Sequence, residues 1–419
     1  MGVWSRGIPS AVEWWRQRPT QAGPIRVGWI VTPLSPFGGT LTHLHRWYET
    51  LDLSRIDPTL FYFSPEEARG LPLPLPAGLK RVCLPALDVQ ADAPQQAVPA
   101  LVRALQQAQI EVLHTIYIVS DLVGALASVL VQKPVISSVE GALLVSSLSP
   151  LRRRALELAY RAVSGRFSRI LTLSNASAEE LRRFIPTHNP PIEILRSSMP
   201  WMPLREPPLE GLELLTVGRL APVKGLPLLV EALERLRGRY PALHWSVVGD
   251  GPDRAPLEAL VRSRGLERQV TFYGWQSPAE VQAHLARALL LVQPSHAEGL
   301  PWSVLEGMAC GVPVVASSVG GLSELLVEKP ENQRCGFLFE PGRSDRLTMV
   351  LAQALEGAEV HRRLAQVGTL AQARVRAQHG PRQEAERLEQ LYQELAGRNV
   401  EPVSSATHAF GQEGGKHEG

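Results

Sequence analysis

Short apolar runs alternate with amphipathic segments along most of the chain. In the first part, six runs have the length and composition of strands, namely IRVGWIVTP, PTLFYFS, EVLHTIYI, PVISSVE, RILTLS and IEILR. Helix-like segments such as QQAVPALVRALQQAQ and NASAEELRRF lie between them. Strands that alternate with helices predict βαβ units, in which parallel strands form one sheet and the helices cover it.

This pattern stops at residues 200–211 and then begins again. The segment PWMPLREPPLEG holds four prolines in twelve residues, which stiffens the chain and prevents regular structure. Strand-like runs then return as LELLTVGRL, HWSVVGDG, QVTFYGW, LLLVQPS, PVVAS and GFLFEP, and the pattern is helical after about residue 344. The sequence therefore predicts two doubly wound α/β domains of similar class, joined by a short linker and facing a cleft.

We predict the following organisation from these patterns. A leader at 1–24 precedes a first domain at 25–200, a linker at 201–211, a second domain at 212–374, C-terminal helices at 375–398 and a tail at 399–419. The tail is polar and rich in glycine, a composition typical of disorder.

Composition narrows the class of protein. The chain has 419 residues, 44% of them hydrophobic, and a formal net charge of only +2, which argues against nucleic-acid binding through phosphates. Its three cysteines are too few for a disulfide framework, so a reducing compartment fits. No stretch approaches the roughly 20 apolar residues that span a bilayer, and the leader lacks the apolar segment of a secretory signal. We therefore expect a cytoplasmic protein.

Two cations lie at the first strand end of the second domain. The stretch LTVGRLAPVKG is typical of a strand, a loop and the start of a helix, with Arg219 and Lys224 in the loop. Gly218 would let a ligand approach the backbone, and a helix N-terminus offers free N–H groups to an anion. Either cation alone is typical of a solvated loop residue, but together they favour binding of a diphosphate.

Two carboxylates flank the turn in HAEGLPWSVLEG. Glu298 lies before Pro301, which suits the first position of a helix, and Glu306 lies inside that helix. The residues alone leave two interpretations open. The carboxylates are either ligand-binding groups of the cleft, or a helix-dipole partner and a solvated face residue.

These motifs follow the order and spacing of a known family. The span 214–341 resembles the nucleotide-sugar domain of the group 1, or family 4, glycosyltransferases, and the matching phrases are VGRLAPVKGLPLLVEAL, WSVVGDGP, VTFYGW and EGLPWSVLEGMACGVPVVASSVGGLSELL. This retaining family includes sucrose synthase, bacterial glycogen synthases and phosphatidylinositol mannosyltransferases. The resemblance implies the B-type fold, in which two Rossmann-like domains face a central cleft and the C-terminal helices cross back to the first domain.

The resemblance also implies an activity. A sugar, hexose-like, would move with retention from a nucleoside-diphosphate sugar to a hydroxyl acceptor, which is a glycan, a lipid-linked molecule or a small molecule, as in glycan biosynthesis. No cofactor is implied besides this donor substrate. No Asp-x-Asp pair occurs in the sequence, so we expect no metal.

Residue roles follow from the resemblance position by position. Arg219 and Lys224 match the family's diphosphate-binding pair, and Glu298 matches the carboxylate beside the transferred sugar; these three are the predicted catalytic residues. Glu306 matches the carboxylate that takes the ribose hydroxyls. The other predicted donor-binding residues are Gly218, Gly299, Leu300, Pro301, Trp275 and Gln276, with Gly38 and Gly39 from the glycine loop of the first domain.

The first domain departs from the family on the acceptor side. His114 matches the first histidine of a His-x-His strand end, but Ile116 takes the second place, and Glu140 replaces a histidine. Ser197-Ser198 replaces Asn-Gly. Glu140 is interpreted equally well as an acceptor-positioning group or as a structural carboxylate. His114 is interpreted as an acceptor-side group or as a core residue, and the core is more common for a histidine in such a strand.

Two further questions stay open in the sequence. The protein could instead be a non-catalytic nucleotide-sugar-binding protein with a degenerate acceptor domain, or a nucleotide-sugar epimerase. Peripheral membrane contact is indicated by Trp4, Trp14 and Trp15 in the leader and by the arginine-rich segment 151–170. A solvated helix and a leader packed on the protein body explain the same residues slightly better.

Overall fold

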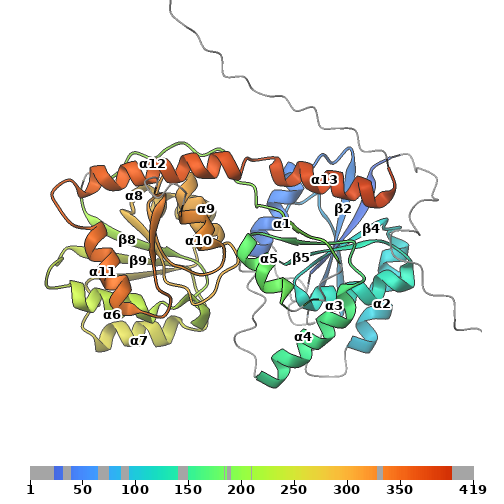
Figure 1. Cartoon of the computed structure of the whole chain (residues 1–419), viewed down its shortest axis with the longest axis horizontal. Coiled ribbons are helices and arrows are strands. Elements are labelled where there is room, and N and C mark those ends of the chain that lie inside the picture. The colour runs from blue at the N-terminus through green and yellow to red at the C-terminus, as the bar shows by residue number, and fades with distance from the viewer. Residues whose placement is uncertain are drawn as a thin grey trace, which may run out of the picture.

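Two parallel sheets, each covered by helices, lie next to each other in the computed structural model of the chain (Figure 1). The structure describes residues 23–31, 39–64, 75–85, 94–139, 150–183, 185, 190–208, 210–327 and 334–398. The predicted tail and nearly all of the predicted leader lie outside these residues. The predicted fold class, two Rossmann-like doubly wound domains, is confirmed.

The first sheet has seven strands in the order β3-β2-β1-β4-β5-β6-β7. They are β1 (Ile25–Val31), β2 (Ile56–Ser64), β3 (Lys80–Pro85), β4 (Val112–Ile116), β5 (Val135–Val139), β6 (Arg169–Thr172) and β7 (Ile192–Ile194). Its helices are α1 (Gly39–Thr50), α2 (Pro94–Gln107), α3 (Ile118–Val131), α4 (Pro150–Ser164) and α5 (Asn175–Arg182). The strand order reverses between β1 and β4, and ligands of doubly wound sheets bind at such a switch point.

The second sheet has six strands in the order β10-β9-β8-β11-β12-β13. They are β8 (Leu212–Val217), β9 (Leu243–Val248), β10 (Val270–Gly274), β11 (Leu290–Gln293), β12 (Val314–Ser317) and β13 (Gly336–Phe339). Its helices are α6 (Pro227–Leu236), α7 (Arg254–Ser263), α8 (Pro278–Arg287), α9 (Trp302–Ala309), α10 (Gly321–Leu326) and α11 (Ser344–Ala354). The switch point lies between β8 and β11, so the two loops with the predicted catalytic residues leave the sheet as neighbours.

Buried apolar side chains cover both faces of the second sheet. Leu229 and Leu233 of α6 belong to the cluster on one face, and Val304 and Met308 of α9 belong to the cluster on the other. Strands covered on both faces carry continuous apolar runs, and this explains the sequence pattern. Burial of one such side chain contributes about 1.5–3 kcal/mol. The two clusters therefore hold the strand ends in fixed positions.

The chain returns to the first sheet after it has completed the second. Helix α12 (Val360–Gln378) packs against α9, and α13 (Gln383–Ala396) packs against β1 and β4. Figure 1 shows the two helices in red across the top of both domains. Leu388, Leu391 and Tyr392 of α13 are buried in the core of the first domain. The last helix is therefore part of the first domain's core.

The two domains meet where helices from each lie close together. Glu324 of α10 accepts hydrogen bonds from the backbone N–H groups of Asn175 (3.0 Å) and Ala176 (2.6 Å), at the start of α5. A carboxylate in this position satisfies unpaired N–H groups and the helix dipole. In a second contact, the rings of His43 on α1 and Trp302 on α9 lie 4.8 Å apart between centroids. Both contacts adjoin the strand ends of the second sheet.

The arginine-rich segment forms α4 on the first domain, where Leu151 and Leu158 are exposed. Among the described residues, no helix is both long and apolar enough to cross a bilayer.

Candidate functional site

The loop after β8 is locked against the loop after β11. Gly225 follows the short helix Pro222–Lys224 with a φ of +61°, and a Cβ there would lie 2.2 Å from the carbonyl oxygen of Pro294. The backbone N–H of His296 donates to the carbonyl of Val223 at 2.7 Å. Only glycine permits this close approach. The two loops therefore form one rigid surface.

An ion pair joins the two loops. Lys224 Nζ lies 2.6 Å from Glu298 Oε1, and the side chains are only 20% and 10% exposed. Gln293 Nε2 and Ser295 Oγ donate to the same oxygen at 2.9 and 2.6 Å. Three donors on Oε1 fix the orientation of the carboxylate. No described residue donates to Oε2, so this oxygen is available to a hydroxyl group of a ligand.

The glycine-rich turns of this domain support the loop of Arg219. A Cβ on Gly249 would lie 1.9 Å from the carbonyl oxygen of Gly218, and one on Gly251 would lie 2.2 Å from that of Leu220. The turn after β9 is thus explained by backbone packing. Arg219 directly follows Gly218, and its side chain is exposed to solvent. Arg219 therefore presents an exposed cation on the same loop as Lys224.

The turn at residues 299–301 is held by the start of α10. Gly320 has a φ of +50°, and a Cβ there would lie 1.8 Å from the carbonyl oxygen of Glu298. The N–H of Gly321 donates to the carbonyl of Gly299 at 2.8 Å, and Leu300 is buried. Pro301 is the residue before α9 and not its first helical residue, as its extended ψ of 124° shows. The predicted sugar-binding turn is therefore rigid.

Glu306 contacts the other domain. Its Oε1 accepts a hydrogen bond at 3.0 Å from Nη2 of Arg46, which belongs to α1. Burial raises the pKa of the Glu306 carboxyl, and the Arg46 charge acts in the opposite direction. The guanidinium of Arg46 also lies 4.6 Å from the centroid of the Trp302 ring. No sequence motif indicated Arg46.

Trp275 and Gln276 lie at the edge of the second sheet. They follow β10, two strands away from β8, and strands in a sheet are about 4.8 Å apart. Trp275 is 58% exposed, and Gln276 Nε2 donates to the carbonyl of Tyr273 at 3.2 Å. Trp275 therefore presents an exposed indole at the same edge of the sheet as the loop of Arg219 and Lys224.

Two family models match the chain, one over each domain. The family described as "Glycosyl transferases group 1" matches residues 205–370, and the "Glycosyl transferase 4-like domain" matches residues 38–196. The chain belongs to the group 1 glycosyltransferases.

Similar curated proteins include three other glycosyltransferases. The chain is 29% identical over 279 residues to the 2-deoxystreptamine N-acetyl-D-glucosaminyltransferase of Streptomyces fradiae, which covers 63% of this chain and 65% of that protein. It is 32% identical over 152 residues to the alpha-D-kanosaminyltransferase of Streptomyces kanamyceticus, and 35% identical over 131 residues to the glycogen synthase of Mycobacterium tuberculosis H37Rv. These shorter matches cover 36% and 31% of this chain and 38% and 32% of the relatives. The matched region thus spans less than two thirds of each relative.

Solved structures share the fold of this glycosyltransferase over nearly their whole length. Sucrose-phosphate synthase from Thermosynechococcus elongatus has a TM-score of 0.76 at 20% identity, covering 89% of this chain and 99% of that one. Anabaena Alr3699/HepE in complex with UDP and glucose has a TM-score of 0.71 at 19% identity, covering 88% and 100%. At this identity the likeness establishes the fold alone.

His114 of the glycosyltransferase is a core residue. Its Nδ1 lies 2.7 Å from the hydroxyl of Tyr392, and its Nε2 lies 2.7 Å from Ser138 Oγ. The ring is fully buried, and burial lowers the pKa of His114 to about 3. The two nitrogens of this buried histidine thus have partners within the protein, and one of them links α13 to the first sheet.

Of the other first-domain residues predicted to bind donor or acceptor, only Gly39 belongs to the described part of the chain. Gly38 and Glu140 lie outside the described residues, and Gly39 is the first residue of α1. Among the side chains of the described segments, no group of three or more His, Cys, Asp or Glu residues could hold a metal ion.

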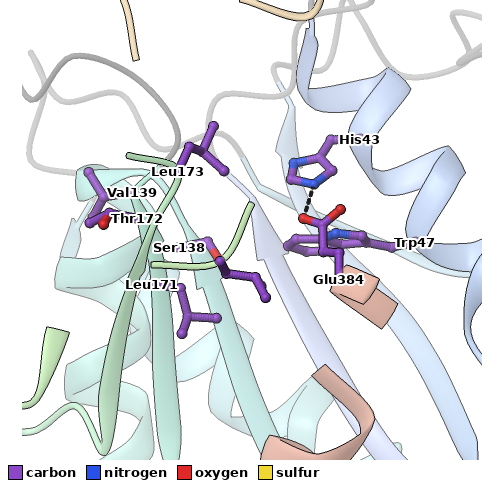
Figure 2. Close-up of a pocket in the computed structure, with 9 residues that line it drawn as sticks. His43, Trp47, Ser138, Val139, Leu171, Thr172, Leu173 and Glu384 are labelled. Atoms are coloured by element: carbon purple, nitrogen blue, oxygen red, sulfur yellow. Dashed lines mark hydrogen bonds and ion pairs between the residues drawn. The ribbon is translucent and has the colours of Figure 1, made fainter. Parts of the chain in front are cut away.

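Ser198, which replaces the family's glycine, fixes the start of α13. Its N–H donates to Glu384 Oε2 at 2.8 Å, and its Oγ accepts from the N–H of Glu384 at 3.0 Å. The other carboxylate oxygen of Glu384 lies 2.6 Å from His43 Nε2 (Figure 2). The adjoining cavity, beside Trp47, has a volume of about 10 Å³, which is room for at most one water molecule. This departure from the family pattern therefore has a structural role.

A larger pocket, of about 430 Å³, lies between the domains. It adjoins Leu300 at the predicted sugar-binding turn and is bounded by Asn175 of α5, Glu324 of α10 and Arg374 of α12. A pocket of this size is in the range that small ligands occupy.

Proposed function

We propose that this glycosyltransferase is a retaining, metal-independent enzyme that transfers a sugar from a nucleoside-diphosphate sugar to a hydroxyl acceptor. The observation that carries the proposal is the Lys224–Glu298 ion pair, 2.6 Å long and largely buried, at the switch point of the second sheet. It brings a cation for the diphosphate next to a carboxylate with an available oxygen for the sugar.

Arg219 and Lys224 would stabilise the leaving group. As the bond between the sugar C1 and the β-phosphate oxygen breaks, negative charge grows on the diphosphate, and fixed cations stabilise this charge without a metal. Glu298 Oε2 would accept a hydrogen bond from a hydroxyl of the transferred sugar and hold the ring in place. Glu306 would take the ribose hydroxyls and Trp275 would contact the base.

The acceptor oxygen would form its bond to C1 on the face from which the diphosphate departs. Its proton would pass to an oxygen of the leaving phosphate, so no base from the protein is required. This route agrees with the structural roles of His114 and Ser198, which hold the first domain together. It preserves the anomeric configuration of the donor.

A uridine nucleotide is the first donor to test, because the solved HepE complexes hold UDP and UDP-glucose. The similar curated proteins act on different sugars and acceptors, so we propose the acceptor only as a hydroxyl compound.

We expect Glu306→Ala to weaken UDP binding by tenfold to a hundredfold. A hydrogen bond to a charged group contributes about 1.5–3 kcal/mol, and about 1.4 kcal/mol corresponds to a factor of ten. Titration calorimetry of the full chain in EDTA measures the effect. Glu356→Ala is the matched control, because Glu356 forms an exposed ion pair with Arg239 within the same domain. Equal affinities of Glu306→Ala and wild type would refute the proposed ribose site.

A non-catalytic donor-binding protein is the second candidate. It is favoured by the first domain, where Ile116 and Ser198 replace family residues and His114 is buried in the core. Such a protein would show a rise in melting temperature with the nucleotide sugar but would form no glycosylated product with any acceptor of a broad panel. Formation of product excludes this candidate.

A further inference from the structure

Arg46 is fixed by contacts on several sides. Its Nη2 donates to Glu306 at 3.0 Å, and the guanidinium carbon lies 4.6 Å from the ring centroid of Trp302. Its Nη1 contacts the sulfur of Met199 at 2.9 Å and the carbonyl of Ser198 at 3.5 Å. An arginine held between a carboxylate and an indole loses little mobility when a further ligand binds.

The Arg46–Glu306 pair joins the two domains. Arg46 belongs to α1 and Glu306 to α9, and the two side chains are only 19% and 20% exposed. Solvent screens such a pair poorly. When one partner is removed, the charge of the other stays partly buried, and water does not fully replace the lost partner. The pair can exist only while α1 and α9 are in contact.

Other charges near the pair are few. Glu384 of α13 and Glu49 of α1 act on Arg46, and Glu306 and Arg205 act on the thiol of Cys310, the residue after α9. Among the described residues, Arg46 is the only cation in direct contact with the Glu306 carboxylate. No described residue donates to Glu306 Oε2, so one oxygen is held by Arg46 and the other is open to a ligand.

We propose that Arg46 is a donor-positioning residue, supplied by the first domain to the ribose-binding carboxylate of the second. This inference rests on the proposed role of Glu306. By holding Oε1, Arg46 turns Oε2 toward the hydroxyls of a nucleotide ribose. The contacts of its guanidinium with Trp302 and Met199 keep Arg46 in place while the ribose binds. The first domain thus contributes to donor recognition, and the complete ribose site forms only when the domains meet.

A mutant cycle on UDP affinity tests this role. We expect Arg46→Met to weaken UDP binding about tenfold, and Arg46→Lys, which keeps the charge but not the planar fork, to lose less. Glu306→Gln should weaken binding by at least as much, and the double variant should bind UDP no more weakly than Glu306→Gln alone. Arg239→Met is the matched control, because its exposed ion pair with Glu356 has the same 3.0 Å length. It should bind UDP like the wild type.

The outcomes separate this inference from the proposed function. If Glu306→Gln binds UDP like the wild type, the ribose site itself is wrong. If Glu306→Gln binds weakly but Arg46→Met binds as well as or better than the wild type, only the role of Arg46 is wrong, since Arg46 then competes with the ribose. A further loss on adding Arg46→Met to Glu306→Gln would show a general packing role and would also overturn the inference. Arg46→Lys applies the same test if Arg46→Met does not fold.

Discussion

Glu298→Gln will lower the rate of glycosyl transfer by about 10²–10³-fold and will leave UDP affinity within about threefold of the wild type or tighter. Glutamine keeps the size of the side chain but places an N–H₂ group where one carboxylate oxygen was. The sugar hydroxyl then loses a charged acceptor. Lys224, whose pair with Glu298 measures 2.6 Å, is no longer neutralised and stays available to the diphosphate. The change therefore affects the chemical step more than nucleotide binding.

Single-turnover kinetics and calorimetry measure these two effects separately. Glu356→Gln serves as the control, because this exposed carboxylate of the same domain also accepts a hydrogen bond from a cation, Arg239. Wild-type turnover of the Glu298→Gln variant would show that Glu298 has no role in the transfer reaction. A loss confined to UDP affinity would assign Glu298 to nucleotide binding instead.

Lys224→Met will lower transfer by about 10²–10³-fold and will also weaken UDP binding. The diphosphate loses one of its two proposed cations as charge develops on it, and a preorganised charge of this kind contributes several kcal/mol to the transition state. Glu298, which is only 10% exposed, also loses its cationic partner, and its unpaired negative charge repels an incoming diphosphate. Both effects act on the phosphates and not on the base or ribose.

Affinity for uridine, which has no phosphate, distinguishes this mechanism from general damage to the site. We expect Lys224→Met to bind uridine like the wild type and UDP at least tenfold more weakly. Lys80→Met is the matched control, because Lys80 pairs with Asp57 at the same 2.6 Å distance on the surface of the first domain. An equal loss for uridine and UDP would show that Lys224 only supports the loop.

The alternation of apolar runs and helical segments predicted both sheets, because strands of parallel sheets are buried on two faces and carry continuous apolar runs. The sequence also placed Lys224 and Glu298 in loops at strand ends, where the structure has them. Their contact follows from strand order, since β8 and β11 are neighbours and their carboxyl ends lie at the same edge. Local sequence thus indicated the loops, and the strand order of the folded sheet brings them together.

Contacts between distant parts of the chain were not predictable in the same way. Arg46 meets Glu306 across 260 positions of sequence, and the contact depends on how the two domains pack. The partner of His114 is Tyr392, which lies 278 positions away on the last helix. Local pattern left two interpretations of His114 open, and the structure buries the ring against the hydroxyl of Tyr392. Gly249 and Gly251 are required by a similar contact between separate segments, because a Cβ at either position would clash with the backbone at Gly218 or Leu220.

The anomeric configuration of the transferred sugar tests the central claim most directly. Proton NMR of the product formed from UDP-glucose and a panel of hydroxyl acceptors, in the presence of EDTA, reports catalysis, metal independence and stereochemistry in one spectrum. The proposed mechanism predicts a glucoside with the α configuration of the donor. A β-glucoside, or a protein that binds UDP-glucose and leaves every acceptor unchanged, would contradict it.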